Sequence, residues 1–218
     1  VLDTDTYELL ASVGAADHSG ALLAGDGDND VVAGSVTDGS ITMGDGTNTV
    51  SIAEGVTNGS ITLGDGANTV DITGDVTDGS ITFGDGDGNV LNVGGDVVAE
   101  QPGTITFGDG DANELNIGGS LINDAVVFGN GAGNTVVIDG DVADGASIQL
   151  GNGGNSVTIN EFTRYSSIAF GTGNDTLTSE NGFRTSTVNM GGGADTLNLL
   201  SGPAGVGYMF PDDAAKST

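Results

Sequence analysis

Short turns in which aspartate alternates with glycine recur along the chain, and their oxygen atoms could bind a metal ion. The segments ITMGDGTNTV (41–50), ITLGDGANTV (61–70) and ITFGDGDGNV (81–90) each place an aspartate directly after the first glycine and an asparagine a few residues later. Carboxylate, amide and backbone carbonyl oxygens are the ligands that Ca²⁺ prefers, and glycine lets backbone carbonyls point toward an ion. The turns therefore predict calcium binding.

The turns share the pattern G-x-G-x-[N/D]-x-U, in which U is apolar, and three of them carry one extra residue before the asparagine. If successive turns stack, these positions form columns, and several calcium ions would lie between neighbouring turns. The predicted metal ligands are Asp26, Asp28, Asn29, Asp45, Asn48, Asp65, Asn68, Asp85, Asp87, Asn89, Asp109, Asp111, Asn113, Asn130, Asn134, Asn152, Asn155, Asp175 and Asp195.

The net charge also indicates a bound cation. The chain has 31 acidic residues, three basic residues and a formal net charge of −28. Carboxylates held about one strand spacing apart repel one another unless a cation lies between them. We therefore expect the chain to be largely disordered without calcium. The same charge argues against binding to nucleic acid or to an anionic membrane, because phosphate groups would be repelled.

The spacing of the turns predicts a repetitive fold. Successive first glycines are 19 to 24 residues apart, and they are Gly25, Gly44, Gly64, Gly84, Gly108, Gly129, Gly151, Gly171 and Gly191. A period near 20 residues that continues over most of a chain is typical of a solenoid. The glycine content, 41 of 218 residues, also disfavours helices.

One repeat, residues 64–83, shows how a coil is built. Val70 and Ile72 alternate with polar residues, and so do Ile81 and Phe83, so each pair predicts a short strand with an apolar inner face. We predict an all-β, calcium-stabilised solenoid with two short strands per coil and about nine coils. The longest interval has its extra residues in VVAEQPGT (97–104), where we expect a protruding loop.

The turns opposite the Gly-x-Gly edge carry Asp38, Asn58, Asp78 and Asp144, mostly in TDG or TNG. They form either a second metal-binding edge or ordinary turns. Asparagine and aspartate before glycine tolerate the left-handed conformation of a tight turn. This favours the interpretation as ordinary turn residues.

The segments GTGNDTLT (171–178) and GGGADTLN (191–198) resemble the nonapeptide repeat of RTX proteins, G-G-x-G-x-D-x-U-x. The resemblance implies a calcium-stabilised β-roll in which Asp175 and Asp195 are calcium ligands. It extends in a looser form over residues 25–200. Here one motif occurs per 20 residues or so, where RTX coils carry two in about 18, and asparagine mostly replaces the aspartate.

No other motif indicates catalysis, and we predict that the chain is not an enzyme. The only histidine, His18, lies in a polar segment before the repeats, and the chain contains no cysteine. Nucleophile-elbow, zinc-protease and Walker-type motifs are missing from the sequence. No apolar stretch approaches the roughly 20 residues that span a bilayer. Arg164 and Tyr165 interrupt the acidic sequence. They form either a contact patch or, in the milder interpretation, an ion pair between Arg164 and Glu161.

The outward positions of the predicted strands suggest a minor alternative. Hydroxyl side chains recur in pairs over four coils, and these are Ser40/Thr42, Ser60/Thr62, Ser80/Thr82 and Thr104/Thr106. Flat threonine arrays of this kind resemble those of ice-binding solenoids. The alternative interpretation is the ordinary preference of threonine for strands.

We divide the chain into an N-terminal partial coil or cap (1–24), the solenoid (25–200) and a C-terminal tail (201–218). Weak caps leave strand edges free, so we expect end-to-end self-association at residues near 7–11 and 197–200. The sequence and its family resemblance predict a secreted calcium-binding structural protein at the cell surface or outside the cell, in a filament, matrix or surface layer. The alternative is an RTX module of a larger adhesin or secreted enzyme.

Overall fold

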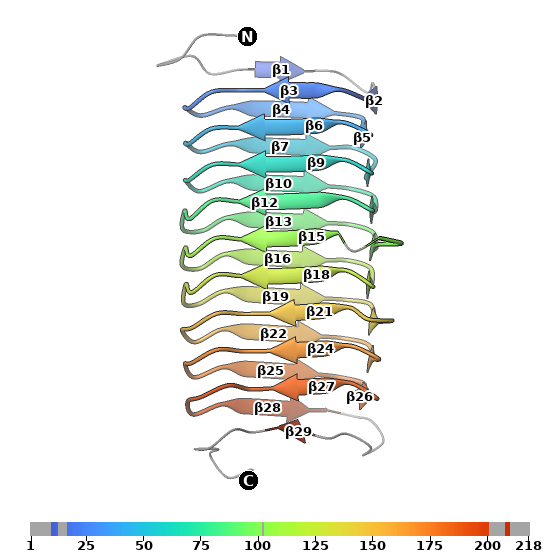
Figure 1. The fold of residues 1–218 in the computed structure, drawn as a ribbon, viewed down its shortest axis with the longest axis vertical. Helices are drawn as coiled ribbons and strands as arrows, with labels where there is room; N and C mark the ends of the chain where they lie inside the picture. Colours follow the sequence, from blue (N-terminus) through green and yellow to red (C-terminus); the bar gives the residue numbers. More distant parts are fainter. Residues whose placement is uncertain (1–9, 13–16, 102, 201–207, 210–218) are drawn as a thin grey trace.

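The computed structural model describes residues 10–12, 17–101, 103–200 and 208–209. These residues form strands and turns without a helix, and the strands stack as a parallel β-solenoid of about nine coils. Figure 1 shows the coils stacked along one axis, with the chain advancing from one end of the rod to the other. This confirms the predicted fold class, which is consistent with a β-roll.

Each coil contributes to three parallel sheets, which we call sheets A, B and C in the order in which the chain enters them. Sheet A is the first in each coil, and its four-residue strands carry apolar residues inward at the second and fourth positions. Its strands are β1 (Leu10–Ser12), β4 (Asp30–Ala33), β7 (Thr49–Ile52), β10 (Thr69–Ile72), β13 (Val90–Val93), β16 (Glu114–Ile117), β19 (Thr135–Ile138), β22 (Ser156–Ile159), β25 (Thr176–Ser179) and β28 (Thr196–Leu199).

Sheet B is narrow and corrects the prediction of two strands per coil. The sequence predicts a turn directly after sheet A, but the residues of this segment pair in register between coils, as Val56 does with Val76. Two residues are too few to show an alternating pattern in the sequence. The strands are β2 (Asp17–His18), β5 (Ser35–Thr37), β8 (Val56–Thr57), β11 (Val76–Thr77), β14 (Val97–Val98), β17 (Leu121–Ile122), β20 (Val142–Ala143), β23 (Thr163–Arg164) and β26 (Phe183–Arg184).

Sheet C completes the coil and leads into the next Gly-x-Gly turn. Its strands also place apolar residues inward, as Ile81 and Phe83 show. They are β3 (Ala21–Leu23), β6 (Ser40–Met43), β9 (Ser60–Leu63), β12 (Ser80–Phe83), β15 (Thr104–Phe107), β18 (Ala125–Phe128), β21 (Ser147–Gln149), β24 (Ser167–Ala169), β27 (Thr187–Asn189) and β29 (Tyr208–Met209).

The corner between sheets B and C requires a left-handed backbone. Asp38, Asn58, Asp78 and Asp144 all have φ between 50° and 56° there, which is the conformation expected of residues in a tight turn. Two coils near the C-terminus place less suitable residues at this position, Tyr165 and Thr185. A bulky or β-branched residue with positive φ is strained.

The predicted insertion lies at the same corner. The offset between paired residues rises from 21 at Val76 and Val97 in sheet B to 24 at Ser80 and Thr104 in sheet C, so three residues are added between them. Figure 1 shows a loop that projects from the rod just before β15. Pairing resumes in register after it, as predicted for an insertion in a solenoid.

Inward residues of the three sheets fill the interior in files that run along the axis. One file consists of fully buried valine and leucine in sheet A, such as Val50, Val70 and Leu91. In sheet C, the rings of Phe83, Phe107 and Phe128 stack in successive coils with centroids 4.7 and 4.3 Å apart. Apolar side chains therefore fill the interior of the described coils, and the polar groups of these coils lie mainly at the corners and on the outer faces.

Candidate functional site

The Gly-x-Gly edge, which joins sheet C to sheet A, holds a buried ladder of asparagines. Asn48 is fully buried, and its Nδ2 donates to the carbonyls of Gly44 at 3.0 Å and Gly46 at 3.3 Å. The same Nδ2 donates to Oδ1 of Asn68 in the next coil at 2.8 Å, and the backbone amide of Asn48 donates to that oxygen at 3.0 Å. One side chain thus closes its own turn and links it to the next.

This arrangement repeats along most of the rod. The backbone amide of each ladder residue donates to Oδ1 of the ladder residue one coil on, from Asn29 to Asp195. The ladder residues are 0–3 % exposed except Asp195, and they are Asn29, Asn48, Asn68, Asn89, Asn113, Asn134, Asn155, Asp175 and Asp195. Buried amides that satisfy their neighbours in this way stabilise the turns.

The ladder bears directly on how these residues could bind a cation. In the asparagine coils, an N–H donor already lies where the glycine carbonyls converge, as it does between Gly151 and Gly153 at Asn155. These carbonyls are satisfied by the amide, so the seven buried asparagines do not present a free oxygen cluster. They fit a hydrogen-bonded ladder better than a set of calcium ligands.

Asp175 breaks the pattern. Its Oδ1 accepts the backbone amide of Asn155 at 2.8 Å, but its buried Oδ2 has no hydrogen-bond partner among the described residues. A carboxylate cannot supply the donors that an asparagine would direct at the carbonyls of Gly171 and Gly173. Burial raises the pKa of the Asp175 carboxyl, and repulsion from Asp195 adds to this while hydrogen bonds from Asn155 oppose it. A cation could satisfy the buried Oδ2, which lacks a partner among the described residues.

A second column of predicted ligands lies on the exposed side of the same edge. Each carboxylate uses Oδ1 to accept the backbone amide of the following coil, as Asp45 does for Asp65 at 2.8 Å. The same bond extends from Asp26 to Asn130, at 2.7–3.0 Å. In the next two coils, neutral side chains continue the column: Asn152 donates to Asn130 at 2.8 Å and accepts from Thr172. The exposed carboxylates therefore cap backbone amides and face solvent with their other oxygen.

A third, shorter column carries Asp28, Asp87 and Asp111. Their Oδ1 atoms accept the amides of Thr47, Asp111 and Ala132 in the following coils, at 2.6–2.8 Å. Apart from Asp175 and Asp195 in the ladder, the predicted carboxylate ligands at this edge therefore belong to two exposed columns and not to a compact cluster. Within the described residues, no group of three or more histidine, cysteine, aspartate or glutamate side chains is arranged to hold a metal ion by itself.

The remaining polar residues do not form a catalytic arrangement. The ring of His18 contacts the carbonyl of Ser40 at 3.2 Å. The predicted ion pair of Arg164 has a different partner: its guanidinium binds Asp141 at 2.5 Å, because Asp141 lies one coil away at the adjoining corner. Glu161 instead accepts the side-chain amide of Asn181 at 2.8 Å.

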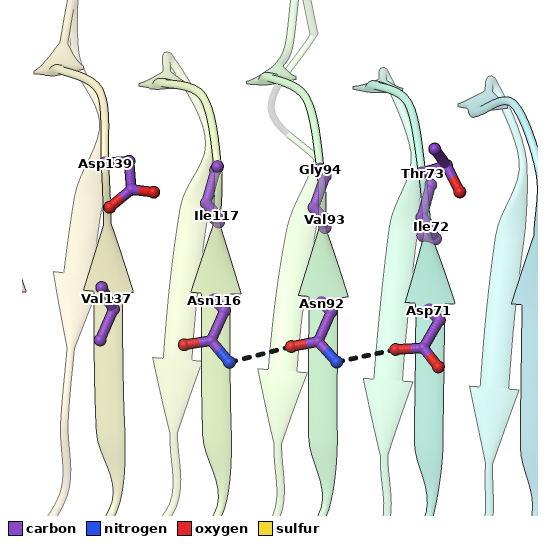
Figure 2. Close-up of a pocket in the computed structure, with 11 residues that line it drawn as sticks. Asp71, Ile72, Thr73, Asn92, Val93, Gly94, Asn116, Ile117, Val137 and Asp139 are labelled. Carbon is purple, nitrogen blue, oxygen red and sulfur yellow. Dashed lines mark hydrogen bonds between the residues drawn. The ribbon is translucent and has the colours of Figure 1, made fainter.

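The outer face of sheet A has a shallow groove, which Figure 2 shows in close-up. Asn116 donates to Asn92 at 2.9 Å and Asn92 donates to Asp71 at 2.7 Å, so a second polar ladder runs along one side of the groove. Gly94 and Gly118 supply no side chains at its floor. This ladder is partly exposed and links neighbouring strands, and its residues were not predicted from the sequence.

Comparison with protein-family models, curated proteins and solved structures found no match to this chain. The described residues also contain no helix that is long and apolar enough to cross a membrane. The resemblance to RTX proteins is therefore limited to the sequence of residues 171–178 and 191–198 and to a fold that is consistent with a β-roll.

Proposed function

We propose that the chain is a secreted, calcium-binding structural protein that acts as a rigid rod in an extracellular assembly. The observation that carries this proposal is the in-register pairing of all three sheets from coil to coil, which makes the solenoid itself the main structural feature. Its interior is filled by side chains and its polar residues serve mainly to join neighbouring coils. Such a molecule suits a filament, matrix or surface layer.

Calcium binding is proposed at two places on the Gly-x-Gly edge. The first is the buried carboxylate of Asp175, together with Asp195 in the next coil and the carbonyls of Gly171 and Gly173. The second is the exposed aspartate column, where neighbouring carboxylates are about one strand spacing of 4.8 Å apart. A bound calcium ion would supply positive charge that these oxygens lack.

Circular dichroism with and without a chelator tests the role of calcium. The asparagine ladder can hold its coils together without a cation. We therefore expect disorder in the absence of calcium only in the coils whose ladder residue is an aspartate. We expect residues 171–199 to lose strand structure after chelation and to regain it in millimolar calcium, while the preceding coils remain folded. Hydrogen exchange measured peptide by peptide would locate the change. A spectrum and an exchange pattern that are unchanged by chelation would contradict the proposal.

End-to-end association is the proposed route to an assembly. Leu199 and Leu200, near the end of the last described coil, are 45 % and 64 % exposed, and β28 is an edge strand of sheet A. The other predicted junction consists of residues 7–11, of which residues 7–9 lie outside the described residues. Electron microscopy and light scattering during stepwise addition of calcium would detect filaments. A folded, calcium-loaded chain that stays monomeric would favour the alternative of an RTX module within a larger adhesin or enzyme.

The register of sheet C supports ice binding as a second candidate. Ser60 pairs with Ser80, and Thr62 pairs with Thr82, so the hydroxyl side chains form two straight files on an outer face. The files continue to Ser40/Thr42 and to Thr104/Thr106, and Val127 ends one of them. Thermal hysteresis should fall in Thr62→Leu and should be unchanged in the control Thr158→Leu on sheet A. Wild-type protein without thermal hysteresis would exclude this function.

A further inference from the structure

A buried carboxylate lies at the corner between sheets B and C, away from the Gly-x-Gly edge. Asp124 follows β17 and precedes β18, at the position that Gly39, Gly59, Gly79 and Gly103 occupy in earlier coils. Its side chain is only 2 % exposed. Oδ1 accepts the amide of Ala125 at 2.6 Å, while the buried Oδ2 has no hydrogen-bond partner among the described residues.

The hydrogen bonds of this corner are interrupted around Asp124. In other coils, the first amide of sheet C donates to the corner carbonyl of the preceding coil, as Ser80 does to Gly59 and Ser147 does to Asp124. Within the described residues, Thr104 and Ala125 make no such bond, and Ala125 donates to the Asp124 side chain instead. The insertion between β14 and β15, in the coil before Asp124, therefore leaves the carbonyl of Gly79 without its usual amide.

Several oxygen atoms converge where these bonds are missing. A Cβ atom placed on Gly103 would lie 2.5 Å from the Gly79 carbonyl oxygen and 3.1 and 3.3 Å from the two Asp124 carboxylate oxygens. The Asp78 carboxylate is also close enough to repel Asp124. Asp78 Oδ1 accepts the amides of Glu100 and Gln101 at 2.6 and 3.1 Å, which holds the start of the inserted loop beside Asp124.

No basic side chain of the described residues compensates this charge. Arg164 lies two coils beyond Asp124 and pairs with Asp141. Arg184 lies three coils beyond Asp124, and its guanidinium is 4.5 Å from the ring centroid of Phe162. Burial raises the pKa of the Asp124 carboxyl from its ordinary value of 3.8 to about 6, partly offset by the Ala125 amide, and Asp78 raises it further. At neutral pH the carboxylate is mostly ionised, and a buried ionised group requires a counter-charge.

We propose that Asp124, Asp78 and the carbonyl of Gly79 bind a hard divalent cation of the calcium class at the corner between sheets B and C. Two carboxylates and a carbonyl are the oxygen ligands that such an ion takes, and water would complete its coordination. The ion would replace the interrupted hydrogen bonds and hold the inserted loop against the rod. This site does not depend on calcium at the Gly-x-Gly edge.

Calorimetric titration with CaCl₂ at pH 7.5 tests the site, with chelator-treated full chain. Asp124→Asn should bind one ion fewer than wild type, and Asp78→Asn should bind that ion at least tenfold more weakly. Asp38→Asn is the control for the loss of one charge at this corner, because Asp38 has the same left-handed conformation as Asp78 and lies two coils from it. Equal stoichiometry and affinity in Asp124→Asn and Asp38→Asn would overturn the proposal.

The same titration in the double variant Asp175→Asn and Asp195→Asn separates this site from the proposed function. If only the double variant loses ions, the corner site is wrong and the Gly-x-Gly site stands. If only Asp124→Asn loses an ion, the corner site stands and the Gly-x-Gly site is wrong. A proton is the competing occupant. Because the pKa of the Asp124 carboxyl is raised in the folded state, its protonation would stabilise the fold below pH 4. This stabilisation would be lost as the pH rises through 6. The proposal would be overturned if the melting temperature falls as the pH rises from 4 to 6 and added calcium does not restore it at pH 7.5.

Discussion

Oδ1 of Asn68 accepts two hydrogen bonds from Asn48, one from its side-chain Nδ2 at 2.8 Å and one from its backbone amide at 3.0 Å. A single buried oxygen therefore joins two coils through both the side chain and the main chain. Within its own coil, Asn68 Nδ2 donates to the carbonyls of Gly64 and Gly66 at 3.0 and 3.1 Å. An amide suits this position because it presents a donor and an acceptor on opposite sides.

Asn68→Asp should destabilise the rod. The carboxylate would keep the acceptor but lose the donors, so two glycine carbonyls and a buried charge would be left without partners. We expect the free energy of unfolding in chelator to fall by about 3 kcal/mol, measured by urea denaturation. Calcium should restore part of the loss. The control Asn198→Asp makes the same chemical change on the exposed face of β28 and should have little effect.

Asp175→Asn should have the opposite effect. The new amide can donate to the carbonyls of Gly171 and Gly173 and would remove a buried carboxylate oxygen that has no partner. We expect the chelated protein to gain about 1–2 kcal/mol and its thermal unfolding to become less sensitive to calcium. Asp139→Asn is the charge-matched control, because Asp139 is exposed and an asparagine can still accept from Asn160. A chelated Asp175→Asn protein that melts below wild type would argue against this interpretation of the ladder.

The stacked phenylalanines should contribute strongly to stability. Phe107 is 1 % exposed and lies between the rings of Phe83 and Phe128. Phe107→Ala removes both ring contacts and leaves a cavity, so the free energy of unfolding should fall by about 3–5 kcal/mol. Phe162→Ala, at a partly exposed position, should cost much less. The free energy of unfolding of both variants can be measured by urea denaturation. An equal decrease in the two would show that the stacked rings contribute no more to stability than a partly exposed ring.

Thr185 offers a stabilising substitution. Its φ of 50° equals that of Asn58 at the same corner, but a β-branched side chain is strained there. Thr185→Asn should raise the free energy of unfolding by about 1 kcal/mol, which differential scanning calorimetry can measure as a higher melting temperature. The control Thr187→Asn, on the exposed face of β27, should give no increase. A lower melting temperature for Thr185→Asn would show that the threonine makes compensating contacts.

The repeats were enough to predict the stacked coils and much of their interior. The alternation of Val70, Ile72, Ile81 and Phe83 identified the inward faces, because a strand exposes successive side chains on opposite sides. The insertion after β14 could also be located, since it made the interval from Gly84 to Gly108 the longest of all. Sheet B could not be predicted, because its strands of two or three residues are too short to show a period.

The candidate site was harder to predict than the fold. Asparagine is both a possible calcium ligand and a hydrogen-bond donor, and the sequence does not show which way its amide points. The occurrence of asparagine in seven successive turns, followed by aspartate at Asp175, was the available signal for a ladder. Asp124 was missed for another reason: the insertion in the preceding coil hides that it takes the place of a corner glycine.

The direction of the hydrogen bonds in the three sheets has a mechanical consequence. Because the strands lie across the rod, the bonds between coils run along its axis and would bear a pulling force directly. A load applied to the two ends should therefore detach coils one at a time from an end, while the remaining coils stay intact. Each coil of 20 residues, as between Val50 and Val70, would release about 70 Å of extended chain. A tether of this kind would lengthen stepwise under tension and absorb energy without breaking.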